Sequence, residues 1–387
     1  MTVEKIMFSL IKSEIAGGSA EDIKAELNPD VLNTLFKLSD KHDMSHIVAS
    51  ALSKLKALSN DEISQKFNKT LMLSVYRDSL KDFAITQVGE ILEKEKIPHI
   101  PLKGTVLRKL YPKPWMRTSC DIDVLVKEED CERAIETLCK EGFKRTADCS
   151  THDYNLVSSN NFHVELHYTL MQEESLITAD KILDKVFDYA YPEKDGGYSY
   201  ALPYEIMLIY HLAHMARHLI HGGCGIRPFI DLWLMNEKIP HDEKAVSESL
   251  EKAGLFDFYN ASLSLSRCWL ENEDYTDETK TLEEFILFGG VYGNTLNAAN
   301  VKAGKGDGKL KSFIGLVFLP RKNLEVLYPN LKKHKILLLF YQVKRWLKVF
   351  DRQKYNKIKR ITNARNSVDV KDSEKIKDML DFLGFKK

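Results

Sequence analysis

The chain has 387 residues, of which 44% are hydrophobic and 29% charged, a balance typical of a globular protein that buries its core without disulfides. The six cysteines form no C-x-x-C pair and no zinc-ligand spacing, and no run of about 18 apolar residues indicates a transmembrane helix. The N-terminus also lacks the apolar segment of a signal peptide. We therefore expect a cytoplasmic protein with no transmembrane segment.

Charge is unevenly distributed along the chain. The formal net charge is zero, with 56 basic and 56 acidic residues, yet residues 301–365 contain 18 Lys or Arg and only three acids. Such a concentration indicates an anionic partner for this region: nucleic acid, phospholipid headgroups or a phosphorylated substrate. A solvated helical surface without a partner explains the same charges equally well.

Residues 1–95 are predicted to form an N-terminal helical region. Apolar residues recur at three- and four-residue spacing in three segments: Lys5 to Ile15, Pro29 to Ser39 and His46 to Leu55. A longer helix is predicted from Asp61 to Glu95, with a broad buried face that includes Leu73, Val75 and Phe83.

The pattern changes at Ile97, and residues 96–200 are predicted to form a compact α/β core. Four short segments are rich in strand-forming residues: Ile97 to Leu102, Asp121 to Val126, Tyr154 to Val157 and Phe162 to Tyr168. A helix is expected from Glu128 to Glu141, ended by Gly142. The four polar residues 158–161 form a hairpin-like turn between the last two strands.

Two further helical regions are predicted after the α/β core. Residues 201–300 form a helical domain that begins with helices from Tyr204 to His221 and from Ile226 to Asn236. Residues 301–387 form the basic helical C-terminal region, with helices around Lys333 to Phe350 and from Asp372 to Leu383. The predicted fold class is therefore α+β, a small mixed sheet with helices that is flanked by N- and C-terminal helical regions.

Asp121 and Asp123 are the first candidates for a functional site. Residues two apart on a strand point to the same face, and two carboxylates side by side repel each other unless a cation lies between them. Hard divalent cations such as Mg²⁺ prefer carboxylate and phosphate oxygens. Glu165 shares a strand face with His163 and His167, and it brings a third carboxylate to the pair if the two strands are adjacent. A solvated surface pair is the alternative.

A short turn upstream adds features that suit a phosphate. Gly104 and Thr105 follow a predicted strand and open a predicted helix, where backbone N–H groups approach a phosphate closely. Thr105 adds a hydroxyl donor. Lys103 and Arg117 are the cations that we expect near a triphosphate, with an exposed lysine and an ion-paired loop arginine as the alternatives.

Four histidines lie on one face of a predicted helix. His211, His214, His218 and His221 stand at i, i+3, i+7 and i+10. They form either a second metal site or a wall that faces phosphate, and ordinary packing is the alternative. Arg227 and Asp231, four residues apart on the next helix, are expected to form an internal ion pair.

These motifs together resemble the nucleotidyltransferase fold of polymerase β-like enzymes. In that fold a glycine and a Ser or Thr precede two acids one residue apart, and a third acid follows on a later strand. The chain is most similar to an uncharacterised bacterial nucleotidyltransferase family, over roughly residues 30–350. Thr105 stands where serine is common and keeps the hydroxyl. The marks of that family in this chain are Pro101 to Gly104, Arg117, Asp121 to Val126, Val164 to His167, His214, His218, Arg227, Asp231, Phe318 to Pro320 and Tyr328-Pro329.

The resemblance implies a nucleotidyltransferase-type core and a residue set for its chemistry. Asp121, Asp123 and Glu165 would be catalytic and would hold two Mg²⁺ ions, with Mn²⁺ as an alternative ion. The expected reaction transfers a nucleoside monophosphate from a nucleoside triphosphate such as ATP to a hydroxyl-bearing acceptor, with release of pyrophosphate. The residues expected at the nucleotide are Lys103, Gly104, Thr105 and Arg117, and those expected at the substrate are His167, His214 and His218.

The sequence leaves the acceptor open among a small molecule, a protein and RNA. The alternative function is a catalytically inactive module of the same fold. Such a module would bind nucleotide, RNA or an anionic membrane through its basic C-terminal region.

Overall fold

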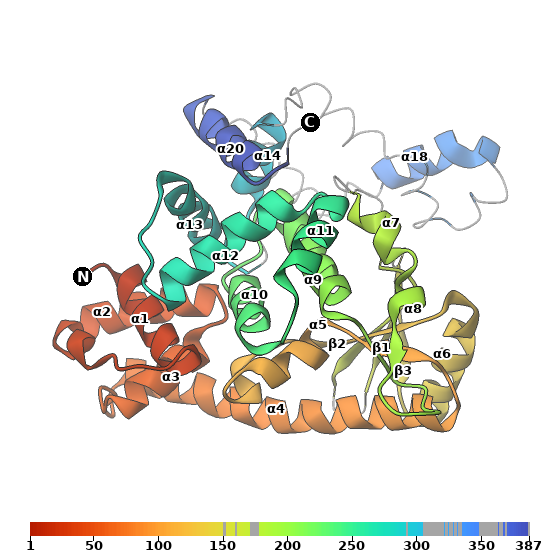
Figure 1. Cartoon of the computed structure of the whole chain (residues 1–387), viewed down its shortest axis with the longest axis horizontal. Coiled ribbons are helices and arrows are strands. Elements are labelled where there is room, and N and C mark those ends of the chain that lie inside the picture. Colours follow the sequence, from red (N-terminus) through yellow and green to blue (C-terminus); the bar gives the residue numbers. More distant parts are fainter. Residues whose placement is uncertain are drawn as a thin grey trace.

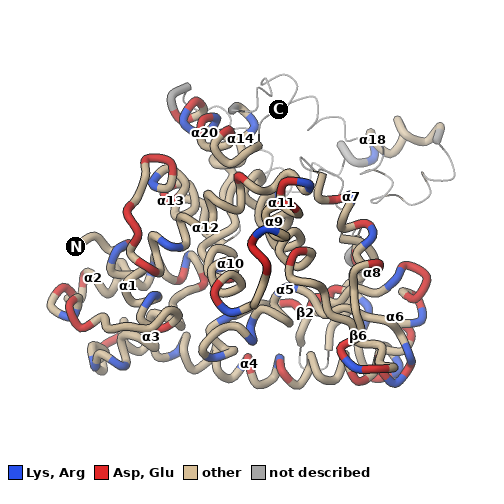
Figure 2. The backbone as a smooth tube through the Cα atoms, in the orientation of Figure 1, with Lys and Arg blue, Asp and Glu red and all other residues tan. Residues whose placement is uncertain are grey.

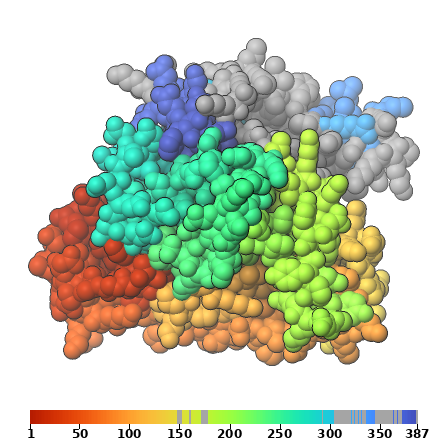
Figure 3. All heavy atoms as spheres, in the orientation of Figure 1, coloured from red at the N-terminus to blue at the C-terminus, as the bar shows by residue number. Residues whose placement is uncertain are grey.

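The computed structural model describes residues 1–149, 152–158, 161–170, 178–291, 293–304, 335–347 and 370–385, with single positions 321, 324, 328, 331, 363 and 367. Figure 1 shows the long helix α4 along one side of the molecule, the N-terminal helices at one end and the sheet at the other. A second layer of helices lies over this base. Figure 3 shows these helices, from residues after 200, as the outer surface over the middle of the molecule.

The helices of the N-terminal region begin where the sequence supplies a capping side chain. Thr2, Asn28 and Asp61 each accept a hydrogen bond from a backbone N–H of the first turn that follows them. The three short helices and the long helix predicted here are confirmed. Their bounds are α1 (Val3–Ile15), η1 (Glu21–Glu26), α2 (Pro29–Lys41), α3 (Ser45–Lys54) and α4 (Glu62–Lys94).

The predicted broad buried face of α4 is wrong in the middle of the helix. At the N-terminal end of α4, Ile63 and Phe67 pack in the core of the N-terminal helices. At its C-terminal end, Val88, Ile91 and Leu92 pack against the apolar face of the sheet. Between these two ends, Leu73, Val75 and Phe83 are exposed. The helix runs from one core to another, so the polar residues Ser74 and Lys81 take the buried positions on its central turns.

A five-stranded mixed sheet forms the α/β core, with strand order β1-β2-β5-β4-β3. Only the β2–β5 pair is parallel; β1–β2, β4–β5 and β3–β4 are antiparallel. The four predicted strands and the hairpin between β4 and β5 are confirmed, whereas the edge strand β3 was not predicted. The strands are β1 (His99–Pro101), β2 (Asp121–Val126), β3 (Lys144–Cys149), β4 (Asp153–Val157) and β5 (His163–His167).

Alternation along β2 and β5 gives the sheet two different faces. Ile122, Val124 and Val126 of β2 join Val164 and Leu166 of β5 in one apolar cluster. This cluster packs against α4 and against α6 (Cys131–Lys140), which follows β2. The acids and histidines of the two strands therefore lie on the opposite face.

Short elements connect the sheet to the helical layer. Those around β1 and β2 are α5 (Lys103–Leu107), η2 (Arg108–Leu110), η3 (Pro114–Met116) and η4 (Glu128–Asp130). Those after β5 are α7 (Ala179–Leu183), α8 (Val186–Tyr189) and the small hairpin of β6 (Tyr191–Pro192) and β7 (Tyr200–Ala201).

The helical layer follows and shares one large apolar cluster with the N-terminal helices. Its helices are α9 (Tyr204–Ile220), α10 (Arg227–Lys238), α11 (Glu243–Ala253), α12 (Phe256–Leu270), α13 (Asp277–Gly289) and α14 (Thr295–Gly304). The C-terminal elements are η5 (Lys335–Leu337), α18 (Leu338–Leu347) and α20 (Val370–Phe382). The α+β fold class is confirmed, while the four predicted domain boundaries stay a prediction.

Charged residues are spread over many elements of the described chain. Figure 2 shows acidic and basic residues interspersed over the N-terminal helices and around α6. Much of the basic region 301–365, including the Phe318 to Pro320 motif, lies outside the described residues. Within the described part of the chain, no helix is both long enough and apolar enough to cross a membrane.

Two buried histidines join the N-terminal helices to the rest of the molecule. The Nε2–H of His42 donates to the carbonyl of Leu287 on α13 at 3.2 Å, and that of His46 donates to the carbonyl of Met116 at 2.9 Å. Burial lowers the pKa of both side chains, that of His42 from 6.5 to about 4. Each imidazole is therefore neutral in the folded protein at pH 7.

We expect His42 to make the fold sensitive to acid. Between pH 6.5 and 4 the unfolded chain binds a proton at His42 that the folded protein does not, so the free energy of unfolding falls as the pH falls. The loss attributable to this residue is about 3 kcal/mol at most. In chemical denaturation at pH 7, 5.5 and 4.5, His42→Gln should lose less stability on acidification than the wild type. The exposed His163→Gln should follow the wild type, and equal slopes for all three proteins would contradict the assignment.

Candidate functional site

Strands β2 and β5 bring the three predicted carboxylates together. Their parallel register sets Asp121 opposite His163 and Asp123 opposite Glu165. Ligand atoms of Asp123, Glu165 and His167 all lie within 4.8 Å of one another. The predicted adjacency of the third acid is confirmed, and His167 joins the group as well. Asp121 lies on the same strand face and lines the same cavity, but it is not part of this close group.

Asp123 is a buried carboxylate that accepts hydrogen bonds from Lys103 and His167. Its side chain is 2% exposed, and its Oδ1 lies 2.9 Å from both the Nζ of Lys103 and the Nε2 of His167. Burial disfavours the charge of Asp123, but Lys103 and His167 outweigh this effect and lower its pKa. Burial likewise opposes the charges of Lys103 and His167, yet their neighbours raise the pKa of both. Asp123 and Lys103 are thus both ionised at pH 7 and compensate each other's charge.

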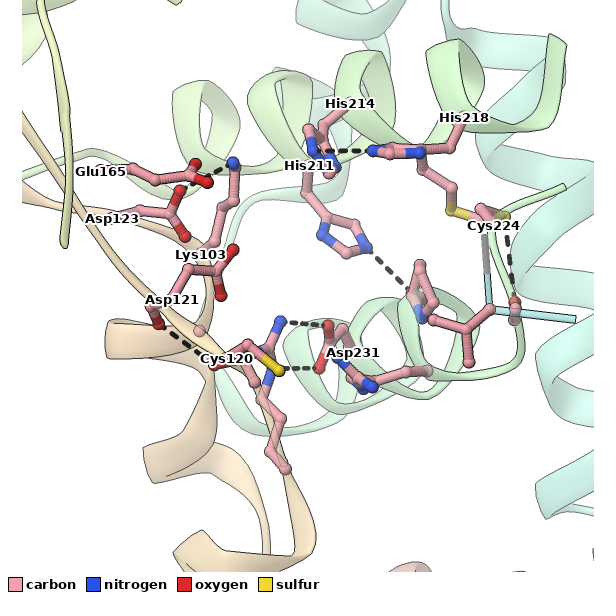
Figure 4. A pocket seen from close by; sticks show the side chains of 18 of the residues that line it. Lys103, Cys120, Asp121, Asp123, Glu165, His211, His214, His218, Cys224 and Asp231 are labelled. Carbon is pink, nitrogen blue, oxygen red and sulfur yellow. Dashed lines mark hydrogen bonds and ion pairs between the residues drawn. The ribbon is translucent and has the colours of Figure 1, made fainter. Parts of the chain in front are cut away.

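A cavity of about 460 Å³ opens on this face of the sheet. Asp121, Asp123 and Glu165 line one wall, together with Lys103 from the start of α5. Figure 4 shows the α9 histidines His211, His214 and His218 across the cavity from these carboxylates, and Asp231 of α10 below them. The cavity therefore lies between the sheet and the helical layer.

Gly104 lies where the chain passes closest to another part of the cavity wall. A Cβ atom at this position would lie 2.5 Å from Nη1 of Arg117 and 2.8 Å from Oγ of Ser119. Any larger residue would displace one of these side chains. The glycine is thus required by local packing, whatever binds in the cavity.

Arg117 is held by a buried partner that its sequence neighbourhood does not reveal. Its Nε and Nη2 donate to the two oxygens of Asp231 at 2.8 and 2.7 Å, and the hydroxyl of Tyr111 donates to the same carboxylate at 2.9 Å. Burial opposes the charge of Asp231, but the guanidinium outweighs it and lowers the pKa of the carboxyl. With Nε and Nη2 on Asp231, the Nη1 side of Arg117 faces Gly104.

The expected ion pair between Arg227 and Asp231 is wrong. Arg227 pairs with Asp43, which also accepts a hydrogen bond from Thr118 at 2.6 Å, while Asp231 pairs with Arg117. Side chains on a helix lean toward its N-terminus, so Arg227 at the first position of α10 leans away from a residue one turn later. A base placed four residues before an acid is also the weaker order on a helix.

The histidines of α9 differ in what they contact. His211 donates to the carbonyl of Pro228 at 2.9 Å, and His221 contacts the carbonyl of Arg217 on its own helix. The Nε2 atoms of His214 and His218 lie 3.2 Å apart. Burial lowers the pKa of His214 well below its usual value and that of His218 to about 4. Both imidazoles are therefore neutral at pH 7.

Comparison with known families gives this geometry a context. The model of a family described as "Uncharacterised nucleotidyltransferase" matches residues 30–271, more than half of the chain. The chain belongs to this nucleotidyltransferase family. The match covers every acidic residue, basic residue and histidine that lines the cavity, and it ends before the C-terminal motif at 318–329. No curated protein matches the chain.

Two residues near the nucleotidyltransferase motifs were not predicted from the sequence. Lys81 of α4 is buried and donates to Ser119, whose hydroxyl in turn lies 3.4 Å from the carbonyl of Asp121. Burial lowers the pKa of Lys81 to about 8. In the sequence, only the position of Lys81 among the apolar residues of α4 could have indicated that this lysine is buried. Ser119 lines the cavity. The predicted Thr105 is buried and is not among the residues that line the cavity, and its hydroxyl has no hydrogen-bond partner among the described residues.

The close group of Asp123, Glu165 and His167 fits a divalent ion. Nucleotidyltransferases usually use divalent metals, and two carboxylates with one imidazole supply suitable ligand atoms. In this structure, the ammonium group of Lys103 forms an ion pair with Asp123 at 2.9 Å, so a cation of the chain itself lies next to the carboxylates. The other group of three ligating residues found among the described positions consists of His152, Asp153 and His167.

We expect Gly104→Ala to disturb the cavity wall. The added methyl group overlaps Arg117 and Ser119, so the Arg117–Asp231 pair must shift, and overpacking of this kind costs about 1–3 kcal/mol. Gly89→Ala on α4 is the matched control, because a Cβ there meets no atom within 4 Å and alanine favours a helix. Thermal unfolding should show a lower midpoint for Gly104→Ala and an equal or higher one for Gly89→Ala. Equal midpoints for the wild type and Gly104→Ala would refute the close packing.

Proposed function

We propose that the protein transfers a nucleoside monophosphate from a nucleoside triphosphate to a hydroxyl-bearing acceptor and releases pyrophosphate. The observation that carries this proposal is the convergence of Asp121, Asp123 and Glu165 on one wall of the cavity, beside Gly104 in the first turn of α5. Membership of the nucleotidyltransferase family supports the same reaction class.

The carboxylates have the arrangement that this reaction needs. Asp121, Asp123 and Glu165 would hold two Mg²⁺ ions, or Mn²⁺ in their place, with His167 against Asp123 and Glu165. When bound, the ions supply positive charge to the triphosphate and to the attacking oxygen. Without that charge, three carboxylates would repel a triphosphate. Lys103 is paired with Asp123 in this structure. When a metal ion binds the carboxylates, the ammonium group of Lys103 would be released from Asp123 and could pair with a phosphate.

The chain's own residues position the two reactants. The N–H of Thr105 donates to the carbonyl of Leu102 at 3.1 Å, so the backbone N–H groups suited to phosphate oxygens at the start of α5 are those of Lys103 and Gly104. The Nη1 side of Arg117 faces the same place and adds a fixed positive charge. The acceptor oxygen attacks the α-phosphorus and gives its proton to water, while the bond from that phosphorus to the bridging oxygen breaks and pyrophosphate leaves.

The acceptor is expected on the side of α9. His214 and His218 face the carboxylates across the cavity and are neutral at pH 7, so they can accept hydrogen bonds from an acceptor hydroxyl. Tyr210 of the same helix is not among the residues that line the cavity, and its ring centroid lies 5.9 Å from the Nζ of Lys103. A cytoplasmic location, where nucleoside triphosphates are abundant, remains part of the proposal.

We expect Glu165→Gln and Asp123→Asn to abolish transfer. The full-length protein is incubated with each α-labelled nucleoside triphosphate, Mg²⁺ and separate metabolite, protein and RNA fractions as acceptors, and labelled product and pyrophosphate are measured. Loss of a metal-binding carboxylate should reduce the rate roughly a hundredfold or more. Glu128→Gln is the matched control, an exposed carboxylate just beyond the end of β2.

The outcomes separate the competing functions. Equal transfer by Glu165→Gln and the wild type would show that the carboxylates are not the catalytic site. Nucleotide binding in calorimetry without product from any acceptor fraction would favour the inactive nucleotide-binding module. Unchanged thermal unfolding of Glu165→Gln would confirm that a loss of activity is not a loss of fold.

We also propose that the basic region 301–365 attaches the protein to an anionic membrane surface. The support is an exposed apolar face at the start of this region's described helix, where Ile336, Leu339, Phe340 and Val343 are 95%, 71%, 59% and 46% exposed. These residues stand at i, i+3, i+4 and i+7 and so share one side of η5 and α18. On the other side, Tyr341 and Gln342 are buried.

The chemistry of this face favours lipid over RNA. RNA-binding surfaces offer aromatic rings and cations to bases and phosphates, whereas three of these four residues are aliphatic. An amphipathic helix with basic neighbours lies in the interface of anionic bilayers. Figure 1 shows α18 at the edge of the molecule, where it can reach a flat surface.

We expect vesicles that contain phosphatidylglycerol to bind the wild type and vesicles of phosphatidylcholine alone to leave it in solution. The double variant Leu339→Asp/Phe340→Asp should lose binding in co-sedimentation by tenfold or more in the apparent dissociation constant, about 1.4 kcal/mol. Met72→Asp, a similarly exposed apolar position on α4, should bind like the wild type. Binding to RNA with strong salt dependence, together with no vesicle binding, would assign the region to nucleic acid instead.

A further inference from the structure

A second group of possible metal ligands lies beside the carboxylates: it shares His167 with them and adds His152 and Asp153, which play no part in the function proposed above. His152 and Asp153 stand at the start of β4, and Asp153 is paired directly with His167 across the β4–β5 ladder. Ligand atoms of these three residues lie within 4.8 Å of one another. All three line the cavity.

The neighbours of this group hold its side chains in place. The Nε2 of His152 lies 2.9 Å from Oδ2 of Asp153, and the amide of Asn155 donates to Oδ1 of the same carboxylate at 2.9 Å. The backbone of His152 is fixed because its carbonyl accepts a hydrogen bond from the N–H of Tyr168 at 3.1 Å. The rings of His152 and His167 are near-parallel, with centroids 5.9 Å apart. An amide that orients a metal-binding carboxylate is a usual outer partner in metal sites.

The ligand types decide which ion suits this group. Mg²⁺ prefers an all-oxygen set with near-octahedral geometry, whereas imidazole nitrogens suit Zn²⁺, Fe²⁺, Cu²⁺ and Ni²⁺. Three protein ligands of the type His, His and Asp leave further coordination positions to water or substrate. Those positions would open into the cavity, because all three residues line it.

We propose that His152, Asp153 and His167 bind a divalent transition-metal ion next to the carboxylate group of Asp123 and Glu165. This site shares His167 with the carboxylate group but takes its other two ligands, His152 and Asp153, from the start of β4, and its existence does not depend on the proposed reaction. Its chemistry makes the cavity selective for ions that accept nitrogen ligands, in addition to the hard ions that the carboxylates attract. A simple ion pair between His152 and Asp153 is the competing explanation, and it predicts no such selectivity.

Cobalt binding tests the site directly. The full-length protein without added histidines is freed of metal with a chelator and titrated with Co²⁺, whose ligand-field absorption in the visible range reports nitrogen ligands and low coordination number. The wild type should bind one Co²⁺ at this group with visible absorption. His152→Ala should weaken the affinity at least tenfold to a hundredfold, or remove the absorption altogether.

Two matched variants separate this site from its surroundings. His163→Ala removes an exposed histidine from the same strand as His167 and should leave the Co²⁺ titration unchanged. Glu165→Gln removes a carboxylate of the neighbouring group and should keep the Co²⁺ absorption while it abolishes transfer. Asp153→Asn is a second test of the site, with thermal unfolding to confirm that each variant is folded.

The result that overturns the proposal is a Co²⁺ titration of folded His152→Ala and Asp153→Asn that equals that of the wild type. Absence of nucleotidyl transfer from the wild type would leave this outcome unaffected, because metal binding is measured without nucleotide. Failure of the proposed function and failure of this site are therefore distinguishable.

Discussion

The buried pair of Arg117 and Asp231 is the interaction on which the arrangement of the cavity depends. It joins the loop before β2 to α10, and so it ties the wall formed by the sheet to the wall formed by the helical layer. Two of the three guanidinium nitrogens, Nε and Nη2, donate to the two carboxylate oxygens, and Tyr111 donates to the same carboxylate. Removing one partner of such a buried pair leaves an uncompensated charge, at a cost of about 3–5 kcal/mol. The close approach of Gly104 follows from the place that the guanidinium takes.

The two walls that this pair connects have different electrostatic character. The sheet wall carries Asp121, Asp123 and Glu165, while the α9 wall carries imidazoles that burial keeps neutral. A triphosphate and three carboxylates share one cavity only if cations are placed between them. In the proposed reaction, Lys103 and Arg117 would supply two such charges from the chain itself. This arrangement accounts for the presence of acids and cations at the same place in a nucleotidyltransferase family member.

Several parts of the site were predictable because they depend on local spacing. The alternation of β2 sets Asp121 and Asp123 on one face and Ile122 and Val124 on the other, and the structure keeps this division. Glu165 lies next to Asp121 and Asp123 only if their strands are adjacent. The order of motifs in the family implied this adjacency, and the parallel β2–β5 pairing confirmed it.

Strand β3 was missed because Lys144 to Cys149 lacks an apolar alternation, as suits a strand at the edge of a sheet.

Other parts were not predictable because they depend on which element packs against which face. A lysine in a long helix usually lies in water, but Lys81 is buried where α4 meets Ser119 of the loop before β2. Leu73, Val75 and Phe83 continue the apolar pattern of α4 and yet face solvent. The partners of Arg227 and Asp231 come from distant loops, although each had a plausible partner one helical turn away.

The sequence by itself determined which side chains share a face of a strand or helix, and thereby the acidic strand face, the glycine turn and the family. These features follow from backbone periodicity and from motifs a few residues long. The tertiary structure alone decided that Lys103 and His167 hold Asp123, that Asp231 holds Arg117, and that His152 and Asp153 lie beside His167. The physical reason is that ion pairing and burial act through space. Residues as far apart as 117 and 231 meet only after the sheet and the helical layer have packed together.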